Sequence, residues 1–160
     1  INYFNDNYPN DFDLYGLRWN TPVTRLQRTF PRIVKHYQSY RGRTENKIET
    51  MSKYKFLICY ENNYGSKGYI TEKIFDALSA KTVPIYLGAS NIENYVDTDT
   101  FIDRRKFSTL KDLAKFITEM TEVEYNKYLV AAERYMKTEK YKKFLPESFC
   151  DTMIAALDLK

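Results

Sequence analysis

The sequence lacks the features that mark several classes of protein. No stretch approaches the roughly 18 consecutive apolar residues that a membrane-spanning helix needs. The only two cysteines, Cys59 and Cys150, are too few and too far apart for a disulfide framework or a zinc site. The single histidine, His36, has basic neighbours that favour a surface position over a catalytic one. A histidine mechanism would rest on this residue alone.

The sequence also shows no internal repeat, no low-complexity linker and no signal-peptide pattern, and it begins with Ile1 rather than Met. We therefore expect residues 1–160 to be a single domain taken from a longer protein. Hydrophobic residues make up 43% of the chain and charged residues 29%, an ordinary balance for a globular protein.

The chain is mildly basic. Its net charge of +4 is spread along the sequence, which suits an anionic ligand such as a nucleoside diphosphate, an anionic acceptor or a membrane surface without requiring any of them. The lysine-rich tract 137–143 indicates a solvated helix end, with peripheral contact to an anionic membrane or acceptor as the alternative. Fifteen tyrosines would suit stacking on nucleic acid, but no recognised RNA-binding motif accompanies them, so we expect no nucleic-acid partner.

Short apolar runs alternate with helical patterns, which predicts an α/β fold with a parallel sheet flanked by helices. The expected strands are 12–15, 54–60, 82–87 and 101–102. The expected helices are 45–53, one from 71, two between 110 and 132, and one after Pro146. Residues 17–31, which contain Pro22 and Pro31, are expected to form a loop.

Periodicity also predicts the core. The continuous apolar run 56–59 is typical of a strand covered on both faces, and it would bury Cys59 as a free thiol. The next helix would bury Ile70, Ile74, Ala77 and Leu78 on one face. The last helix would bury Phe149, Met153, Ile154 and Leu157.

The most informative stretch is 54–88, where a buried strand ends in a glycine-containing loop and a helix begins near Thr71. Open α/β folds bind ligands at such strand–loop–helix units, at the carboxyl edge of the sheet. Thr71 is a good N-cap residue, and Glu72 in the first turn favours the same start. The amides and dipole at such a helix start suit a phosphate.

Helical spacing brings Tyr69, Glu72, Lys73 and Asp76 together on the side opposite the apolar face. A lysine neutralises a diphosphate, a carboxylate accepts hydrogen bonds from ribose hydroxyls, and a tyrosine packs or donates. The alternative interpretation is a capped surface helix with a solvated Glu–Lys face.

Three linked sequence blocks favour the ligand site over the surface helix: YEN at 60–62, GYITEKI at 68–74 and VPIYLG at 83–88. At this spacing they resemble the signature of glycosyltransferase family 10, the α1,3/4-fucosyltransferases. The likeness extends more weakly over nearly the whole chain, but it covers only the donor half of the family's architecture.

The resemblance implies a Rossmann-like domain, the C-terminal half of a GT-B enzyme that takes fucose from GDP-fucose and inverts the anomeric centre. It implies no metal on the diphosphate and no other cofactor. Lys73 would pair with the diphosphate, Glu72 would hold the ribose, and Tyr69 would contact the donor near its phosphates or sugar. Asn62 would line the pocket beside Thr71.

The family also uses an arginine upstream of the Glu-Asn segment against the phosphates. Arg41 and Arg43 are the candidates here, with Arg18 behind them. The catalytic base is expected in an N-terminal acceptor domain that this chain lacks, so the isolated chain should be inactive or very weak on its glycan acceptor. The cytoplasmic face of a bacterial membrane and a secretory-pathway lumen both remain open as locations.

Three alternatives stay open at this point. The chain would be a transferase for another GDP-sugar, a non-catalytic module that binds GDP or a GDP-sugar, or an unrelated nucleotide-binding α/β protein. Asp97-Thr98-Asp99 imitates the Asp-x-Asp metal motif of another glycosyltransferase architecture. It lacks the strand–loop context of a metal–diphosphate site, so we expect no metal there.

Overall fold

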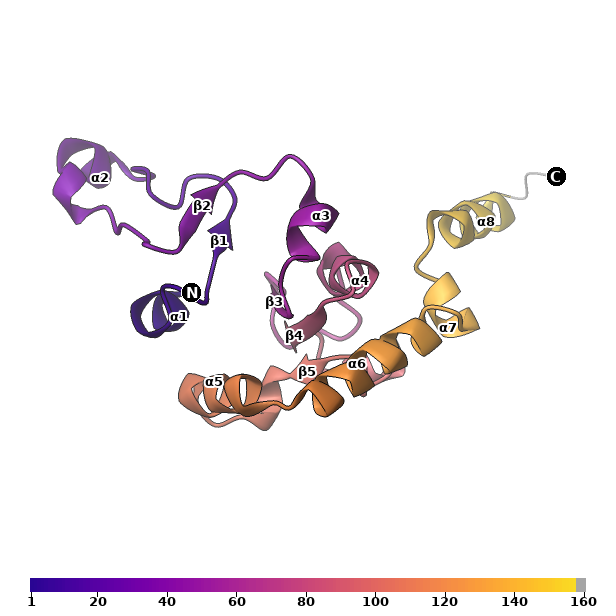
Figure 1. The fold of residues 1–160 in the computed structure, drawn as a ribbon. Helices are drawn as coiled ribbons and strands as arrows, with labels where there is room; N and C mark the ends of the chain where they lie inside the picture. Colours follow the sequence, from indigo (N-terminus) through magenta and orange to yellow (C-terminus); the bar gives the residue numbers. More distant parts are fainter. Residues whose placement is uncertain (158–160) are drawn as a thin grey trace. The chain divides into compact units, whose positions relative to one another are not determined.

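The computed structural model describes residues 1–157 (Figure 1). The chain divides into two compact units, Ile1–Lys47 and Ile48–Lys160. The first contains α1 (Asn2–Asn7), β1 (Leu14–Tyr15), α2 (Arg25–Thr29), a 3₁₀ turn (Pro31–Ile33) and β2 (Tyr40–Gly42), and α3 (Lys47–Met51) begins at its boundary. The second continues with β3 (Phe56–Tyr60), α4 (Glu72–Ser79), β4 (Val83–Leu87), β5 (Ile102–Asp103), α5 (Leu110–Glu119), α6 (Glu122–Tyr135), α7 (Glu139–Lys142) and α8 (Pro146–Ala156).

The first unit is built on a short parallel pair of strands. Leu14 of β1 pairs with Tyr40 of β2. The buried side chain of Asn5 in α1 accepts hydrogen bonds from the backbone N–H and the hydroxyl of Ser39, at 3.2 and 2.9 Å. These two bonds satisfy a polar group that would otherwise be costly to bury.

One segment of this unit corrects the sequence-based expectation. The prolines predict a loop over 17–31, but Arg25–Thr29 form helix α2. Thr24 and Gln27 make a capping box: the Thr24 hydroxyl accepts from the Gln27 amide at 3.2 Å, and the Gln27 side chain accepts from the Thr24 amide at 3.0 Å. Because α2 buries no residue, these local bonds support the helix.

The second unit contains a parallel three-stranded sheet in the order β3-β4-β5. The pairing of β3 with β4 runs in register from Phe56 opposite Val83 to Tyr60 opposite Leu87. The central strand β4 is buried from Val83 to Tyr86, whereas only Cys59 of β3 is fully buried. The predicted burial of 56–59 is therefore complete only at Cys59, because β3 lies at one edge of this sheet. Its neighbours are partly buried: Phe56 packs against Tyr125, and Leu57 packs against the core cluster of this unit.

The core of this unit joins the sheet to α4 and α6. Its buried cluster contains Cys59, Ile74, Ala77, Leu78, Tyr86, Ile92, Val96, Phe101, Ala132 and Tyr135. The predicted buried face of α4 is thus confirmed at three positions, while Ile70 is partly buried just before the helix. The prediction of a buried free thiol at Cys59 is also confirmed.

The last helix is predicted correctly in place but wrongly in burial. α8 begins at Pro146, yet it buries no residue. Four apolar side chains expected in the core are exposed: Phe149 at 66%, Met153 at 47%, Ile154 at 49% and Leu157 at 59%. Helical spacing identifies a shared face, but it does not say what covers that face. None of the helices within residues 1–157 combines the length and apolar character that a membrane crossing needs.

Candidate functional site

The predicted site lies where β3 and β4 end side by side. Glu61 directly follows β3, and its backbone N–H donates to the carbonyl of Leu87 at 2.8 Å. The loop that begins at Glu61 then contacts the chain after β4, because the Gly65 N–H donates to the Gly88 carbonyl at 3.0 Å. The loop and the start of α4 therefore lie at the carboxyl edge of the parallel sheet, where folds of this class bind ligands.

A buried carboxylate organises this edge. The side chain of Glu61 is 0% exposed. Its Oε1 accepts from the Thr71 N–H at 2.8 Å, and its Oε2 accepts from the Thr71 hydroxyl at 2.7 Å and from Nζ of Lys73 at 3.0 Å. Burial alone would raise the pKa of Glu61, but the bonds from Thr71 and Lys73 outweigh burial and hold that pKa below its usual value. Glu61 is therefore ionised at neutral pH.

Thr71 occupies the N-cap position of α4, as predicted, but its side chain makes no capping hydrogen bond. Its hydroxyl is directed to Glu61 instead. The helices α5 and α6 begin differently, since the hydroxyls of Thr109 and Thr121 each accept from an amide of their own first turn. The first turn of α4 thus presents amide groups that the N-cap side chain does not use.

The other predicted residues of this unit surround that turn. Lys73 is partly exposed, with 30% of its side chain accessible. Glu72, in the first turn of α4, is exposed, and so are Tyr69 and Asn62 in the preceding loop. An ammonium, a carboxylate and an aromatic ring are therefore accessible within one short segment, as the sequence predicts.

The two candidate arginines belong to the first unit. Arg41 lies in β2, where its Nε pairs with Asp13 at 2.6 Å and its Nη1 donates to the Gln38 carbonyl at 2.9 Å. Arg43 follows β2 and is exposed. Arg41 therefore already has an acidic partner within its own unit, which makes it the more constrained of the two.

Sequence reasoning missed the role of Glu61. The residue is part of the family-like YEN block, but the resemblance predicts a place in the site only for its neighbour Asn62. The available signal was an acid placed immediately after a buried strand, where an unpaired carboxylate is costly. Such a position requires nearby donors, and Thr71 and Lys73 supply them.

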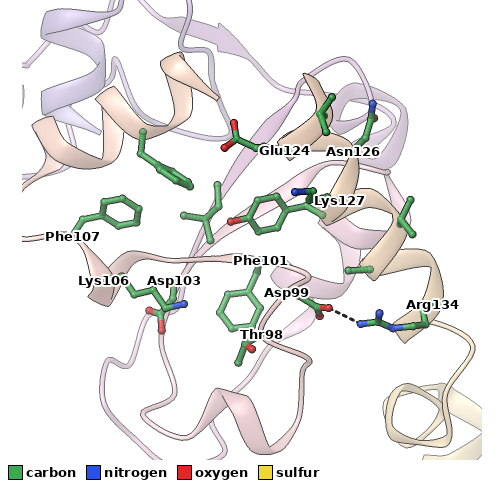
Figure 2. A pocket seen from close by; sticks show the side chains of 16 residues that line it. Thr98, Asp99, Phe101, Asp103, Lys106, Phe107, Glu124, Asn126, Lys127 and Arg134 are labelled. Carbon is green, nitrogen blue, oxygen red and sulfur yellow. Dashed lines mark hydrogen bonds and ion pairs between the residues drawn. The ribbon is translucent and has the colours of Figure 1, made fainter. Parts of the chain in front are cut away.

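A cavity of about 980 Å³ lies elsewhere in the second unit, around β5, α5 and α6. Apolar side chains, including Phe101 and Phe107, line much of it (Figure 2). Arg134 of α6 and Asp99, which both line the cavity, form an ion pair. None of the residues predicted to bind the donor lines this cavity.

Both aspartates of the Asp-x-Asp segment form ion pairs with basic side chains. Asp97 accepts from Lys140 at 3.0 Å, and Asp99 pairs with Arg134. Across residues 1–157, no group of three or more His, Cys, Asp or Glu side chains is arranged to hold a metal ion.

Comparison with known proteins gives a family match over most of the chain. Residues 21–157 match the sequence model described as "Glycosyltransferase family 10 (fucosyltransferase) C-term". An alpha-(1,4)-fucosyltransferase of Arabidopsis thaliana is 40% identical over 80 residues, which cover 49% of this chain and 20% of that protein. The 4-galactosyl-N-acetylglucosaminide 3-alpha-L-fucosyltransferase 9 of Mus musculus is 42% identical over 78 residues, which cover 48% of this chain and 21% of that protein. The aligned part of this chain thus spans about a fifth of the length of these curated relatives.

Solved structures agree with the fold. An alpha1,3-fucosyltransferase with GDP matches with a TM-score of 0.52 and 31% identity, covering 61% of this chain and 28% of the other. An alpha1,3-fucosyltransferase with GDP-fucose matches over 78% of this chain and 40% of the other, with a TM-score of 0.52 and 24% identity. The expected α/β fold, a parallel sheet flanked by helices, is confirmed.

Proposed function

The chain belongs to glycosyltransferase family 10, and from this premise we propose that it is the donor-binding part of an inverting fucosyltransferase. Its ligand would be GDP-fucose before transfer and GDP after it. We propose that residues 1–160 act as one donor-binding domain. The acceptor-binding domain and its catalytic base would belong to another part of the same protein, and the acceptor would be a glycan hydroxyl.

One observation carries this proposal: at the carboxyl edge of the sheet, Lys73 and the first turn of α4 stand together, and Thr71 does not cap that turn. Amides at a helix start and an ammonium both favour a diphosphate. The solved alpha1,3-fucosyltransferase with GDP, which is 31% identical, supports a guanosine diphosphate as the ligand.

The chemistry follows from those charges. In an inverting transfer the acceptor oxygen forms a bond to the anomeric carbon of fucose, while the bond from that carbon to the β-phosphate oxygen breaks. The leaving electron pair stays on GDP, and a base takes the proton of the acceptor hydroxyl. Lys73 would stabilise the negative charge that grows on the leaving diphosphate. This chain contributes that stabilisation, and we assign it no base.

The remaining predicted residues receive roles on the same basis. Glu72 would accept hydrogen bonds from the ribose hydroxyls, and Tyr69 and Asn62 would contact the donor from the loop before α4. Arg43 and Arg41 stay candidates for a second phosphate contact, supported by the family likeness. Because Asp13 already holds Arg41, we place Arg43 first.

The test is isothermal titration calorimetry of the 160-residue chain with GDP, GDP-fucose, UDP and CMP. We expect the two guanosine ligands to bind and the other two to bind at least about tenfold more weakly. Lys73→Ala should weaken GDP binding by about tenfold or more, since it removes a charged contact to phosphate. The matched control is Lys115→Ala, an exposed lysine of α5. A preference for UDP, or equal GDP affinity in Lys73→Ala and the wild type, would overturn the proposal.

A further inference from the structure

We propose that Glu61 is a positioning residue for donor binding. Its buried carboxylate directs the Thr71 hydroxyl away from the α4 amides and holds the Lys73 ammonium beside them, so that both present one anion site. This inference rests on the proposed binding of guanosine diphosphate at that turn.

The first step of the argument is the saturation of the carboxylate. Both oxygens of Glu61 accept hydrogen bonds, one from the Thr71 amide and one from the Thr71 hydroxyl together with Lys73. With a side chain that is 0% exposed, no rotamer change can carry the carboxylate into water without breaking these bonds. The Glu61 carboxylate is therefore held in one position, and it fixes the positions of Thr71 and Lys73.

The second step concerns the helix start. A threonine at an N-cap position normally accepts a hydrogen bond from an amide two or three residues on. In α5 and α6 this bond is present, at Thr109 and Thr121. At Thr71 the hydroxyl donates to Glu61 at 2.7 Å, and its backbone is extended, with φ −106° and ψ −178°. Thr109 and Thr121 also donate to a carboxylate, but that carboxylate belongs to the first turn of their own helix, at Asp112 and Glu124. The carboxylate that binds the Thr71 hydroxyl lies outside α4, and this hydroxyl accepts from no amide of the helix.

The third step concerns the lysine. A lysine side chain that makes no contacts samples many rotamers, and ordering it costs conformational entropy. The bond to Glu61 at 3.0 Å holds Nζ of Lys73 at the start of its own helix. An ammonium has three N–H donors, and this bond uses one of them. Lys73 is therefore ordered before the ligand arrives, which lowers the entropic cost of binding.

A negative charge near a phosphate also has an opposing effect, because it repels the ligand. The two effects predict opposite results when Glu61 loses its charge. If positioning dominates, Glu61→Gln weakens GDP binding. If repulsion dominates, the same variant strengthens GDP binding. The sign of the change therefore decides the inference.

The experiment compares GDP with guanosine, which lacks the phosphates, on the wild-type chain and on Glu61→Gln. GDP is titrated by calorimetry, and guanosine is followed by ligand-detected NMR, which reaches weak affinities. We expect Glu61→Gln to bind GDP about tenfold more weakly and to bind guanosine as the wild type does. The reason is that an amide nitrogen cannot accept the Lys73 hydrogen bond.

A second pair of variants keeps the inference testable if Glu61→Gln fails to fold. Thr71→Val keeps the side-chain shape but loses the hydroxyl bond to Glu61, while Thr71→Ser keeps the hydroxyl. Valine leaves the α4 amides uncovered but removes one of the three donors that fix the Glu61 carboxylate, and this carboxylate holds Lys73. We therefore expect Thr71→Val to bind GDP several-fold more weakly, and Thr71→Ser to bind it as the wild type does. A purely structural role would change guanosine and GDP binding equally.

The outcomes separate this inference from the proposed function. If the wild-type chain does not bind GDP, or if Lys73→Ala binds it equally well, the proposed function fails and the inference fails with it. If wild type and Lys73→Ala behave as expected, but Glu61→Gln binds GDP as tightly as or more tightly than wild type, the positioning role alone is wrong. The positioning role is equally wrong if Glu61→Gln or Thr71→Val loses guanosine and GDP binding in equal measure.

Discussion

Gly88 leaves the space that the side chain of Glu61 occupies. A Cβ atom added at Gly88 would lie 2.5 Å from Cγ of Glu61 and would also collide with the hydroxyl oxygen of Tyr86. Neither neighbour can move freely, because Tyr86 is 1% exposed and its hydroxyl accepts from the Ala89 amide. The glycine at the end of β4 is thus explained by the acid at the end of β3.

We therefore expect Gly88→Ala to destabilise the chain and to weaken GDP binding together. Overpacking of this kind costs about 1–3 kcal/mol in the free energy of unfolding. Urea unfolding followed by circular dichroism measures the first effect, and calorimetry measures the second. An unfolding free energy within about 0.5 kcal/mol of wild type would contradict the close packing at this position.

One buried and one exposed isoleucine give a matched pair of substitutions. Ile74 of α4 is 0% exposed, whereas Ile154 of α8 is 49% exposed. We expect Ile74→Ala to cost about 2–5 kcal/mol of unfolding free energy, because it leaves a cavity. Ile154→Ala should change it by less than about 0.5 kcal/mol, since alanine is the better helix former. Equal losses in the two variants, measured by urea unfolding, would show that α8 is buried after all.

The pKa of Glu61 predicts how stability depends on pH. The folded state lowers that pKa below the unfolded value of 4.5. The ionised carboxylate therefore stabilises the fold above about pH 4.5, and this contribution is lost as the pH falls through the lower folded pKa. We expect the stability difference between wild type and Glu61→Gln to be largest near pH 7 and to shrink toward about pH 3. Thermal unfolding across this range is the measurement, and a difference that grows on the acid side would be inconsistent with the geometry.

The Asp-x-Asp segment gives a prediction about metal. Since Asp97 pairs with Lys140 and Asp99 with Arg134, we expect GDP binding to be equal in EDTA and in Mn²⁺. The double variant Asp97→Asn/Asp99→Asn should bind GDP as wild type does under both conditions. A Mn²⁺-dependent gain in GDP affinity that disappears in the double variant would assign these aspartates to the site.

The sequence is most informative where local pattern and packing agree. The spacing of Ile74, Ala77 and Leu78 predicts a buried helix face, and all three are buried. The segment 83–86, which contains no charged residue, becomes the central strand of the sheet. The family-like blocks also lie in this part of the chain, which is why the family is recognisable from residues alone.

The sequence is less informative where burial or hydrogen bonding depends on residues far away along the chain. Phe149 and its neighbours have helical spacing, but burial depends on another surface, and α8 leaves them exposed. α2 was missed because a capping box, formed by Thr24 and Gln27, outweighs the nearby prolines. The role of Glu61 depends on Thr71 and Lys73, ten and twelve positions later, so the bonds become visible only once the loop is folded.

The buried thiol of Cys59 has a practical consequence. Its Sγ donates to the Lys73 carbonyl at 3.3 Å, so the sulfur lies directly under the backbone of α4, whereas Cys150 is exposed. An alkylating reagent should modify Cys150 at once and reach Cys59 only when α4 lifts from the sheet. In a Cys150→Ser variant, the rate at which Cys59 is labelled therefore measures how often α4 opens. A nucleotide bound at the start of α4 should slow the labelling of Cys59. The labelling rate then reports how much of the nucleotide site is occupied, without an acceptor and without turnover.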